Sequence, residues 1–311
     1  MSSIAILGEA LIDLRVVTGV EPREEGRPAA RSYTAQPGGS PFNVAIGLGR
    51  LGHRAAFAGR LADDALGGIL RRHAQQSGVS LELAGEWPGP TPAALFDLNE
   101  DGSARYEFHL GDDAGESIFS ASDGARVDVT AVDAVHFGSI AAWLPGCAAS
   151  VLDAVARLRR GGVFVSYDPN IRGMLIRDKD EARGRVEEAV SLSDLVKASV
   201  EDLAWLYPEL GVADVAQQWL RAGVNTVIVT HGAEGADCYT AGGMLHGSSE
   251  PVAVVDTVGA GDAFMAALLD GIGETGAVTQ PILDAACAYA AATCAVPGAD
   301  PPWRSIPVRT A

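Results

Sequence analysis

Short apolar runs alternate with longer amphipathic stretches along this chain. The runs are rich in Val, Ile, Ala and Phe, which is typical of buried strands. Amphipathic stretches at 66–77, 147–160 and 212–221 have the spacing of helices. Strands that alternate with helices form a parallel sheet with helices on both faces, so the pattern predicts an α/β fold. The predicted strands cover residues 4–8, 55–59, 134–139, 163–168, 195–200 and 226–232.

Three segments do not follow this alternation. Residues 10–17 and 30–36 are extended and follow the first strand without a helix. Residues 91–110 alternate in polarity on both sides of Asp101-Gly102, which predicts a hairpin. We expect these segments to form a small β-sheet that lies over the carboxyl edge of the main sheet as a lid. An extension of the sheet edge is the alternative. The whole chain, residues 1–311, is then one domain that carries a lid.

Composition and charge narrow the class of partner. Hydrophobic residues make up 48% of the chain and charged residues 20%, which predicts a folded core and argues against disorder. The net charge of −17 argues against a nucleic acid or an acidic membrane as partner, and it requires a locally positive site for an anionic substrate. No apolar run reaches the length of a bilayer, and the apolar N-terminus carries Glu9 and Asp13 without a basic region. We therefore expect a cytoplasmic protein.

Several cofactor sites are not indicated. The four cysteines form no C-x-x-C pair, so we expect buried, reduced thiols at Cys147, Cys238, Cys287 and Cys294. The stretch from Gly47 to Gly52 matches G-x-G-x-x-G, but Ser40 and Pro41 precede it as a helix cap and first position rather than a strand. Gly47 and Gly49 then fall inside or late in a helix, and Gly52 ends it. The match does not indicate a dinucleotide site, and no P-loop motif is present.

One short segment combines glycines, which weaken a helix, with an acidic residue, which is unfavourable in an apolar core. Residues 256–262 read DTVGAGD and lead into the apolar stretch AFMAALLDG. Small residues ahead of good helix formers predict a helix that starts at 259–262 and ends at Gly271. The first N–H groups of a helix lack intrahelical partners, and glycine lets a ligand approach them, so we predict an anion site. Asp262 beside it is suited to deprotonate a hydroxyl that attacks a phosphoryl group, with a plain helix cap as the alternative.

Another group of residues matches the needs of a polyhydroxyl ligand. Gly38 and Gly39 in QPGGSPFN expose backbone ahead of a predicted helix, and Asn43 lies in its first turn. Asp13 follows the first strand. A sugar hydroxyl both donates and accepts hydrogen bonds, so a carboxylate together with N–H donors predicts a sugar site. A role in a turn or at the surface is the alternative for Asp13.

Two later strands also end in candidate groups. Arg172 in DPNIR places positive charge at a strand's carboxyl end, where ligands bind in such sheets. A surface arginine is the alternative. The stretch TVIVTHGAEG, residues 226–235, runs from a strand into a turn of Thr and Gly that is suited to flank phosphates.

These clusters, in this order, resemble the ribokinase-like carbohydrate kinases, the phosphofructokinase-B (PfkB) group. DTVGAGDAF is similar to the family's C-terminal signature, and PGGSPFNVAIGLGRLG followed by FAGRLADDALG is similar to its N-terminal signature. The resemblance extends over about residues 4–300. Within the family, GEALIDL, GGSPFN and DPNIR look most like bacterial fructokinases.

The resemblance implies ATP-dependent transfer of the γ-phosphoryl group to a primary hydroxyl of a sugar, with fructose 6-phosphate as the product. It implies that Asp262 is the catalytic base and that the N–H groups at Gly259, Ala260 and Gly261 stabilise the transferring phosphoryl group. The residues implied to hold the sugar are Asp13, Gly38, Gly39, Asn43, Arg172 and, from the lid, Phe108. The residues implied to lie along the nucleotide are Lys197, Thr230, Gly232 and Gly235.

The resemblance also implies cations and a partner. K⁺ is expected near the carbonyl groups of Asp256 and Val258 and the 293–298 loop, and together with Mg²⁺ it would offset the negative charge where ATP binds. A homodimer that pairs two lids is expected by analogy with similar kinases.

The chain departs from the family at two places. The N-x-x-E pair tied to magnesium stands here as Ser199-Val200-Glu201-Asp202, which leaves open whether Glu201 or Asp202 serves the metal through water. His231 stands where an apolar residue is usual, and the sequence offers no reason for it. Other substrates also stay open: ribose, 2-keto-3-deoxygluconate, tagatose or a nucleoside. A sugar or nucleotide sensor without turnover is the alternative outside the enzymes.

Overall fold

A large mixed sheet forms the centre of the protein. The computed structural model describes residues 3–16, 32–98, 104–111, 113–273 and 277–304. Neighbouring strands of the sheet are parallel except for β13, which is antiparallel to both β12 and β14. Its strands are, in spatial order, β14 (Gly243–Gly247), β13 (Ala236–Thr240), β12 (Thr226–Thr230), β11 (Leu195–Ser199), β10 (Phe164–Asp168), β9 (Ala134–Gly138), β1 (Ser3–Leu7) and β4 (Arg54–Ala58). The six predicted strands are confirmed within one or two residues, whereas the antiparallel edge was not predicted.

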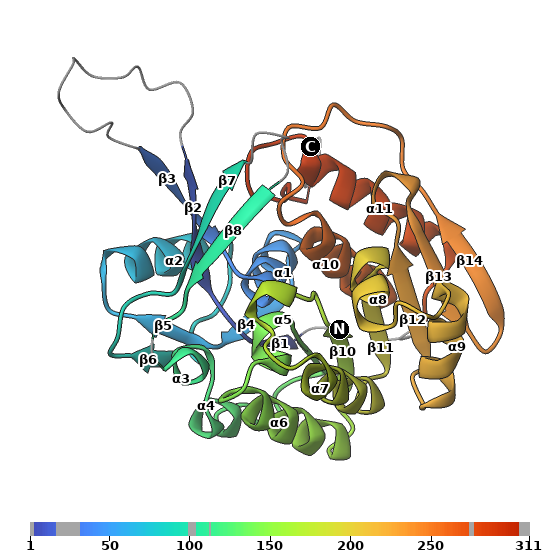
Figure 1. The fold of residues 1–311 in the computed structure, drawn as a ribbon, viewed down its shortest axis with the longest axis horizontal. Coiled ribbons are helices and arrows are strands. Elements are labelled where there is room, and N and C mark those ends of the chain that lie inside the picture. The colour runs from blue at the N-terminus through green and yellow to red at the C-terminus, as the bar shows by residue number, and fades with distance from the viewer. Residues whose placement is uncertain (1–2, 17–31, 99–103, 112, 274–276, 305–311) are drawn as a thin grey trace, which may run out of the picture.

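Helices cover both faces of this sheet, as predicted (Figure 1). Strand β1 shows why: Ile4 and Ile6 enter one apolar core, and Ala5 and Leu7 enter the other. Side chains of successive strand residues point to opposite faces, so a strand buried on both sides reads as a continuous apolar run. The helices of the first core are α1 (Ser40–Arg50), α2 (Ala65–Gln76), α10 (Ala260–Ile272) and α11 (Gln280–Cys294). The helices on the other side are α3 (Ala114–Ile118), α4 (Ala121–Ala125), α5 (Ser139–Trp143), α6 (Ala148–Arg160), α7 (Lys179–Ser191), α8 (Val200–Leu206) and α9 (Val212–Arg221).

The predicted small sheet is present as a separate four-stranded unit. Its order is β3 (Tyr33–Gly38), β2 (Leu11–Val16), β7 (Ala93–Leu98) and β8 (Ala104–His109), with β2 and β7 parallel and the other pairs antiparallel. Figure 1 shows it at the upper left, and it contacts α1 and α2 of the main body. The predicted turn at Asp101-Gly102 lies outside the described residues, as do residues 17, 30 and 31. The remaining elements are the strand pair β5 (Arg60–Ala62) and β6 (Gly85–Trp87) and the 3₁₀ turns η1 (Gly173–Leu175) and η2 (Gly232–Glu234).

Two predicted helix boundaries differ from the structure by one residue. Ser40 is not the cap of α1 but its first residue, and Gly39 precedes it with φ 100°. Gly271 does not end α10: it lies inside the helix, where a Cβ would come within 2.6 Å of Ile282, so it allows α10 and α11 to pack closely. Gly273 follows the last residue of α10 with φ 46°. The predicted end of α1 is confirmed, since Gly52 has φ 88° just beyond it.

The cysteines are unpaired, as expected. Cys147, Cys238 and Cys287 are buried, and Cys294 is partly buried. Among the described helices, none combines the length and apolar character needed to cross a membrane.

Two helical glycines provide a matched test of the packing of α1. A Cβ on Gly49 would lie 2.2 Å from the Ser77 carbonyl oxygen, whereas nothing lies within 4 Å of one on Gly184 in α7. We expect Gly49→Ala to lower the free energy of unfolding by about 1–3 kcal/mol through overpacking. We expect Gly184→Ala to raise it by up to about 1 kcal/mol through helix propensity. Urea unfolding of both variants measures this, and equal effects would contradict the packing.

Candidate active site

A cavity of about 640 Å³ opens at the carboxyl ends of the large sheet's strands, below the small sheet. Cavities of this size suit small-molecule ligands. Most of the predicted site residues line it: Asp13, Gly39, Asn43, Phe108, Arg172, Lys197, Glu201, Asp202, Thr230, Gly232, Gly235, Val258, Gly259, Ala260, Gly261 and Asp262. Gly38 and Asp256 are not part of this lining, but Gly38 lies against Asp13 and the Asp256 carboxylate accepts a hydrogen bond from the Val258 N–H. The structure thus brings together residues from Glu9, near the start of the chain, to Cys294 at the end of α11.

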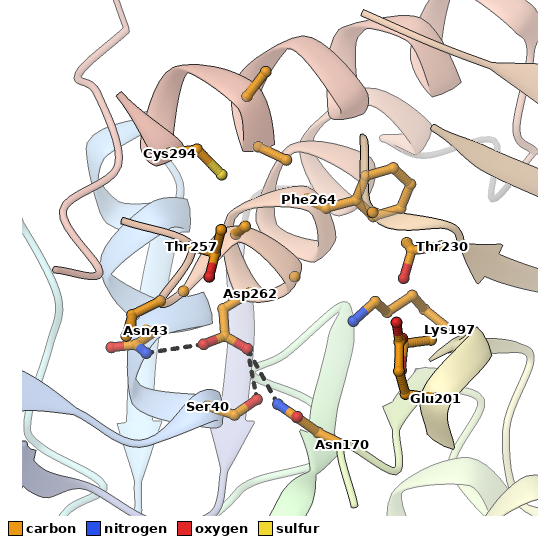
Figure 2. A pocket seen from close by; sticks show the side chains of 18 of the residues that line it. Ser40, Asn43, Asn170, Lys197, Glu201, Thr230, Thr257, Asp262, Phe264 and Cys294 are labelled. Atoms are coloured by element: carbon orange, nitrogen blue, oxygen red, sulfur yellow. Dashed lines mark hydrogen bonds between the residues drawn. The ribbon is translucent and has the colours of Figure 1, made fainter. Parts of the chain in front are cut away.

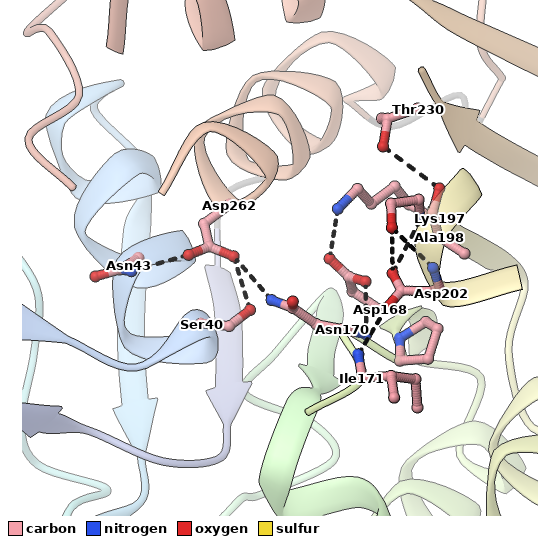
Figure 3. Close-up of polar contacts among 12 residues, drawn as sticks. Ser40, Asn43, Asp168, Asn170, Ile171, Lys197, Ala198, Asp202, Thr230 and Asp262 are labelled. Carbon is pink, nitrogen blue, oxygen red and sulfur yellow. Dashed lines mark hydrogen bonds and ion pairs between the residues drawn. The ribbon is translucent and has the colours of Figure 1, made fainter. Parts of the chain in front are cut away.

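Asp262 sits at the centre of the cavity wall, in the first turn of α10 (Figure 2). Its carboxylate accepts hydrogen bonds from Ser40 Oγ at 2.7 Å and from Asn43 Nδ2 at 2.8 Å, both in α1. Asn170 Nδ2, just after β10, donates a longer bond of 3.5 Å (Figure 3). Three donors leave a lone pair of the carboxylate to accept a further hydrogen bond from a ligand hydroxyl. The side chain is therefore fixed in position while it stays able to take a proton.

The start of α10 has the geometry of the predicted anion site. Gly259 adopts φ 76°, a left-handed conformation that suits glycine, and a Cβ on it would lie 2.4 Å from the Ala299 side chain. The Ala260 N–H donates a long bond of 3.3 Å to the Thr257 carbonyl oxygen. The Gly261 N–H has no acceptor among the described residues. A helix start with a bare N–H group and close backbone access favours a phosphoryl group.

A buried cation lies beside this helix start. Lys197 Nζ would be 2.8 Å from a Cβ on Gly261, so the glycine leaves room for the ammonium group. Lys197 forms an ion pair of 2.8 Å with Asp168, and both side chains are at most 5% exposed (Figure 3). Burial raises the pKa of Asp168 to about 6 against the opposing effect of Lys197. Burial alone would lower the pKa of Lys197, but Asp168, together with Asp202 and Asp262, opposes it and the net shift is upward. The lysine therefore carries a positive charge next to the anion site.

Carboxylates and one arginine gather at the other end of the cavity. Burial raises the pKa of Glu9 and of Asp13 to about 7, partly offset in each case by Arg172. Glu9 accepts a hydrogen bond from the Ala141 N–H at 3.3 Å. Gly38 faces Asp13, since a Cβ on it would lie 2.3 Å from Asp13 Oδ2. Gly38, which the sequence analysis assigned to ligand binding, thus also makes room for the Asp13 carboxylate.

The structure separates the two candidate magnesium residues at the start of α8. Asp202 accepts hydrogen bonds from the Ser199 hydroxyl at 2.9 Å and from the Ile171 N–H at 2.7 Å, and it is buried. It holds the helix cap and the DPNIR turn in place. Glu201 is exposed and faces the cavity. Among the described residues, no group of three His, Cys, Asp or Glu side chains could enclose a metal, so a cation here would need ligand or water oxygens as well.

The two segments predicted to hold K⁺ lie against each other. The Asp256 carboxylate accepts hydrogen bonds from the Val258 N–H at 3.1 Å and the Gly298 N–H at 3.0 Å. The Cys294 carbonyl oxygen accepts from the Asp256 N–H at 3.2 Å. Backbone carbonyl groups from such adjoining loops are donors of the kind that a hard monovalent cation prefers.

His231 has a structural partner that explains its polarity. Its Nε2 lies 3.0 Å from Asp237 Oδ2 in β13, and His246 in β14 lies 2.7 Å from the other oxygen of the same carboxylate. The three side chains tie together the antiparallel edge β12–β13–β14. Thr230 and Gly232, on either side of His231, line the cavity.

Sequence reasoning missed several residues that build the site. Asn170 stands in the DPNIR stretch from which only Arg172 was selected, and Ser40 was assigned to a helix cap instead. The S-x-x-D spacing of Ser199 and Asp202 is a capping-box signal that could have identified the structural acid. The missed residues are Glu9, Ser40, Ser139, Asp168, Asn170, Thr257 and Phe264.

The raised pKa of Glu9 predicts a pH-dependent stability. On folding it rises from 4.5 to about 7, so the folded protein keeps a proton that the unfolded chain releases in this range. Stability from this proton is present below about pH 4 and is lost as the pH rises to 7. Glu9→Gln mimics the protonated form. It should raise the free energy of unfolding by up to about 3 kcal/mol at pH 8 and by less than about 1 kcal/mol at pH 5.

Urea unfolding at both pH values measures this gain. Glu188→Gln on the exposed face of α7 is the control and should show no such pH dependence. An equal gain from Glu9→Gln at pH 5 and pH 8 would contradict the raised pKa.

Comparison with known proteins identifies the family. The model of the family described as pfkB family carbohydrate kinase matches residues 1–306. A fructokinase from Rhizobium leguminosarum bv. trifolii is 36% identical, over 86% of this chain and 78% of its own length. A fructokinase from Escherichia coli is 31% identical, over 90% of this chain and 87% of its own length.

Solved structures show the same architecture. A fructokinase with bound ATP from Xylella fastidiosa is 25% identical, with a TM-score of 0.81 over 96% of this chain and 93% of that one. A fructokinase from Vibrio cholerae O395 with fructose, ADP and calcium ion bound is 27% identical, with a TM-score of 0.79 over 96% of this chain and 94% of that one. A mutant of the Vibrio cholerae protein, with fructose, ADP and potassium ion bound, is 28% identical, with a TM-score of 0.80 over the same shares of the two chains. Since the family model spans nearly the whole chain, this chain belongs to the pfkB family of carbohydrate kinases, ATP-dependent phosphotransferases that act on sugars.

Proposed function

We propose that this chain is an ATP-dependent fructokinase that converts fructose to fructose 6-phosphate. The observation that carries the proposal is the Asp262 carboxylate. It is held by Ser40 and Asn43 at the start of α10, between the anion site and the sugar end of the cavity. The fructokinase relatives from two bacteria support the choice of fructose.

Asp262 is the proposed general base. It accepts the proton of the sugar's primary hydroxyl as the oxygen attacks the γ-phosphorus of ATP, and the bond from that phosphorus to the β,γ-bridging oxygen breaks to release ADP. Phosphoryl transfer needs alignment and charge stabilisation more than covalent help from the protein. The backbone N–H groups at 259–261, with Gly261 foremost, donate to the transferring phosphoryl oxygens. Lys197 lies next to Gly261 and adds positive charge at the same point.

The sugar is proposed to lie between the small sheet and α1. Asp13 and Arg172 bind hydroxyl groups, together with backbone at Gly39. Asn43 uses one amide N–H on Asp262, so its carbonyl oxygen and its other N–H are left for the sugar. Phe108 in β8 covers the sugar as part of the lid. Gly38 contributes by leaving space for Asp13.

ATP is proposed to extend from the anion site along Thr230, Gly232 and Gly235, all of which line the cavity. Glu201 is the proposed acid for Mg²⁺, through water, because Asp202 is committed to Ser199 and Ile171. Mg²⁺ neutralises phosphate charge when bound. K⁺ is proposed at the carbonyl groups of Asp256 and Val258 with the 293–298 loop. The cations bound in the Vibrio cholerae structures are in keeping with a divalent and a monovalent site.

The assembly and location are also proposals. Tyr33 in β3 is 42% exposed on the small sheet, and we place a homodimer contact there, lid against lid. An ATP-dependent enzyme with four unpaired cysteines is suited to the cytoplasm.

A sugar panel tests the proposed function directly. We expect release of ADP from Mg-ATP with K⁺ present to be fastest with fructose. The panel contains fructose, ribose, glucose, tagatose, adenosine and 2-keto-3-deoxygluconate. Preference for another compound would keep the chemistry at Asp262 and reject the fructose assignment. ATP binding without turnover on any of them would instead indicate a sensor.

A pair of variants tests whether Glu201 serves Mg²⁺ while Asp202 caps α8. Glu201→Gln removes the exposed acid of the pair, and we expect it to raise the Mg²⁺ concentration needed for half-maximal activity at least several-fold without loss of stability. Asp202→Asn breaks a buried, charge-assisted cap and should lower the free energy of unfolding by about 1–3 kcal/mol. Mg²⁺ titrations and urea unfolding measure the two effects. The opposite assignment would hold if the effects were exchanged.

A further inference from the structure

One side chain of the small sheet, that of Arg15, reaches beyond the sheet and contacts the loop before α10. Arg15 in β2 donates a hydrogen bond of 2.7 Å from Nη1 to Asp256 Oδ2, and the two form an ion pair. Arg15 stands two positions after Asp13, so both side chains lie on the same face of β2. Strand β2 thus carries Asp13, which is proposed to bind the sugar, and Arg15, which connects the same strand to the loop before the anion site.

Asp256 is the organising residue of that loop. The oxygen that accepts from Arg15 also accepts from the Gly298 N–H, and the other oxygen accepts from the Val258 N–H. Its side chain is 8% exposed. Gly259, the residue before α10, follows three positions later and packs on Ala299. A shift of the carboxylate would therefore move both segments that shape the anion site.

Two further contacts hold Arg15 and the loop in register. The Arg15 guanidinium lies 5.6 Å from the centre of the Phe96 ring in β7, its neighbour in the small sheet. Such a contact between a cation and an aromatic face is attractive and limits the rotamers of the arginine. Gln36 in β3 lies across the strand pair from Asp13. A Cβ on Gly298 would lie 2.9 Å from the side-chain amide of Gln36, so the glycine allows this close approach.

We propose that Arg15 is a positioning residue: its ion pair with Asp256 latches the small sheet onto the 256–259 loop and links sugar binding to the order of the anion site. This inference rests on the proposed fructokinase function. The latch adds to the stability of the state in which the sheet lies over the cavity. A ligand's apparent dissociation constant equals its intrinsic value divided by the fraction of protein in the competent state. Loss of the latch lowers that fraction and so weakens sugar binding.

The variants are Arg15→Met, which keeps the aliphatic stem, and Arg15→Lys, which keeps the charge. Arg183→Met is the matched control. Arg183 is 33% exposed against 37% for Arg15, and it also pairs with an aspartate, Asp180. It lies over an aromatic ring as well, Tyr207. It sits on α7, and it does not line the cavity.

The first readout needs no ligand. Hydrogen–deuterium exchange of the free protein reports on the Val258 and Gly298 amides, both of which donate to Asp256. We expect faster exchange there in Arg15→Met and no change in Arg183→Met. The second readout is the fructose dissociation constant by calorimetry, without nucleotide and with saturating ADP. We expect the fructose dissociation constant of Arg15→Met to be about three- to fivefold higher than that of the wild type. The kcat should stay within about twofold, and Arg15→Lys should recover most of the loss.

If Arg15→Met and Arg183→Met give the same amide exchange and the same fructose affinity, the proposed role of Arg15 is wrong. An equal fall in kcat and in stability without a change in fructose affinity would also overturn it, because that is a structural effect. If the wild-type protein neither binds nor phosphorylates fructose, the proposed function fails by itself. The exchange readout still decides for or against the latch in that case.

Discussion

The carboxylate of Asp262 is the point on which the site depends, because two helix starts meet there. Ser40 and Asn43 begin α1, Asp262 begins α10, and their side chains are joined by hydrogen bonds of 2.7 and 2.8 Å. The close packing of these helices in one core sets the direction of both N-termini. The start of α10, the Asp262 carboxylate and the glycine pair before α1 thus take their relative positions from the contact between these two helix starts.

Charge is the second constraint. The chain carries a net charge of −17, and Arg172 and Lys197 are the two cationic side chains among the described residues that line the cavity. Each is placed against acids: Lys197 on Asp168, and Arg172 near Glu9 and Asp13. Buried acids with a raised pKa reduce stability at neutral pH, and such groups cluster where function requires them. The site is thus built at a cost to the folded state that its ligands and their cations would offset.

Much of the fold and the centre of the site could be predicted from local sequence. The alternation of apolar runs predicted the sheet and its two helical faces, and DTVGAGD predicted the helix start that carries Asp262 in its first turn. These signals are local, since period and glycine placement act within a few residues. Gly271 misled for the same reason: a glycine near a helix end suggests a cap, but its role here is close packing on Ile282 of α11.

The residues that were missed act through distant partners. Ser40 and Asp262 are 222 positions apart, and Lys197 finds Asp168 only because β10 and β11 are neighbours in the sheet. Arg15 is unremarkable in sequence, and its meaning comes from the contact with Asp256. Pairings of this kind depend on strand order and helix packing, which no short motif encodes.

The most direct test of the account is the kinetic and binding behaviour of Asp262→Asn. Asparagine has the same shape, but it cannot take the proton of the attacking hydroxyl. We predict a fall in kcat of at least about 10²-fold, with the dissociation constants of ATP and fructose within a few-fold of wild type. Asp153→Asn, on the exposed face of α6, should leave all three unchanged. An Asp262→Asn enzyme that retains a kcat within tenfold of wild type would contradict the central role of this carboxylate.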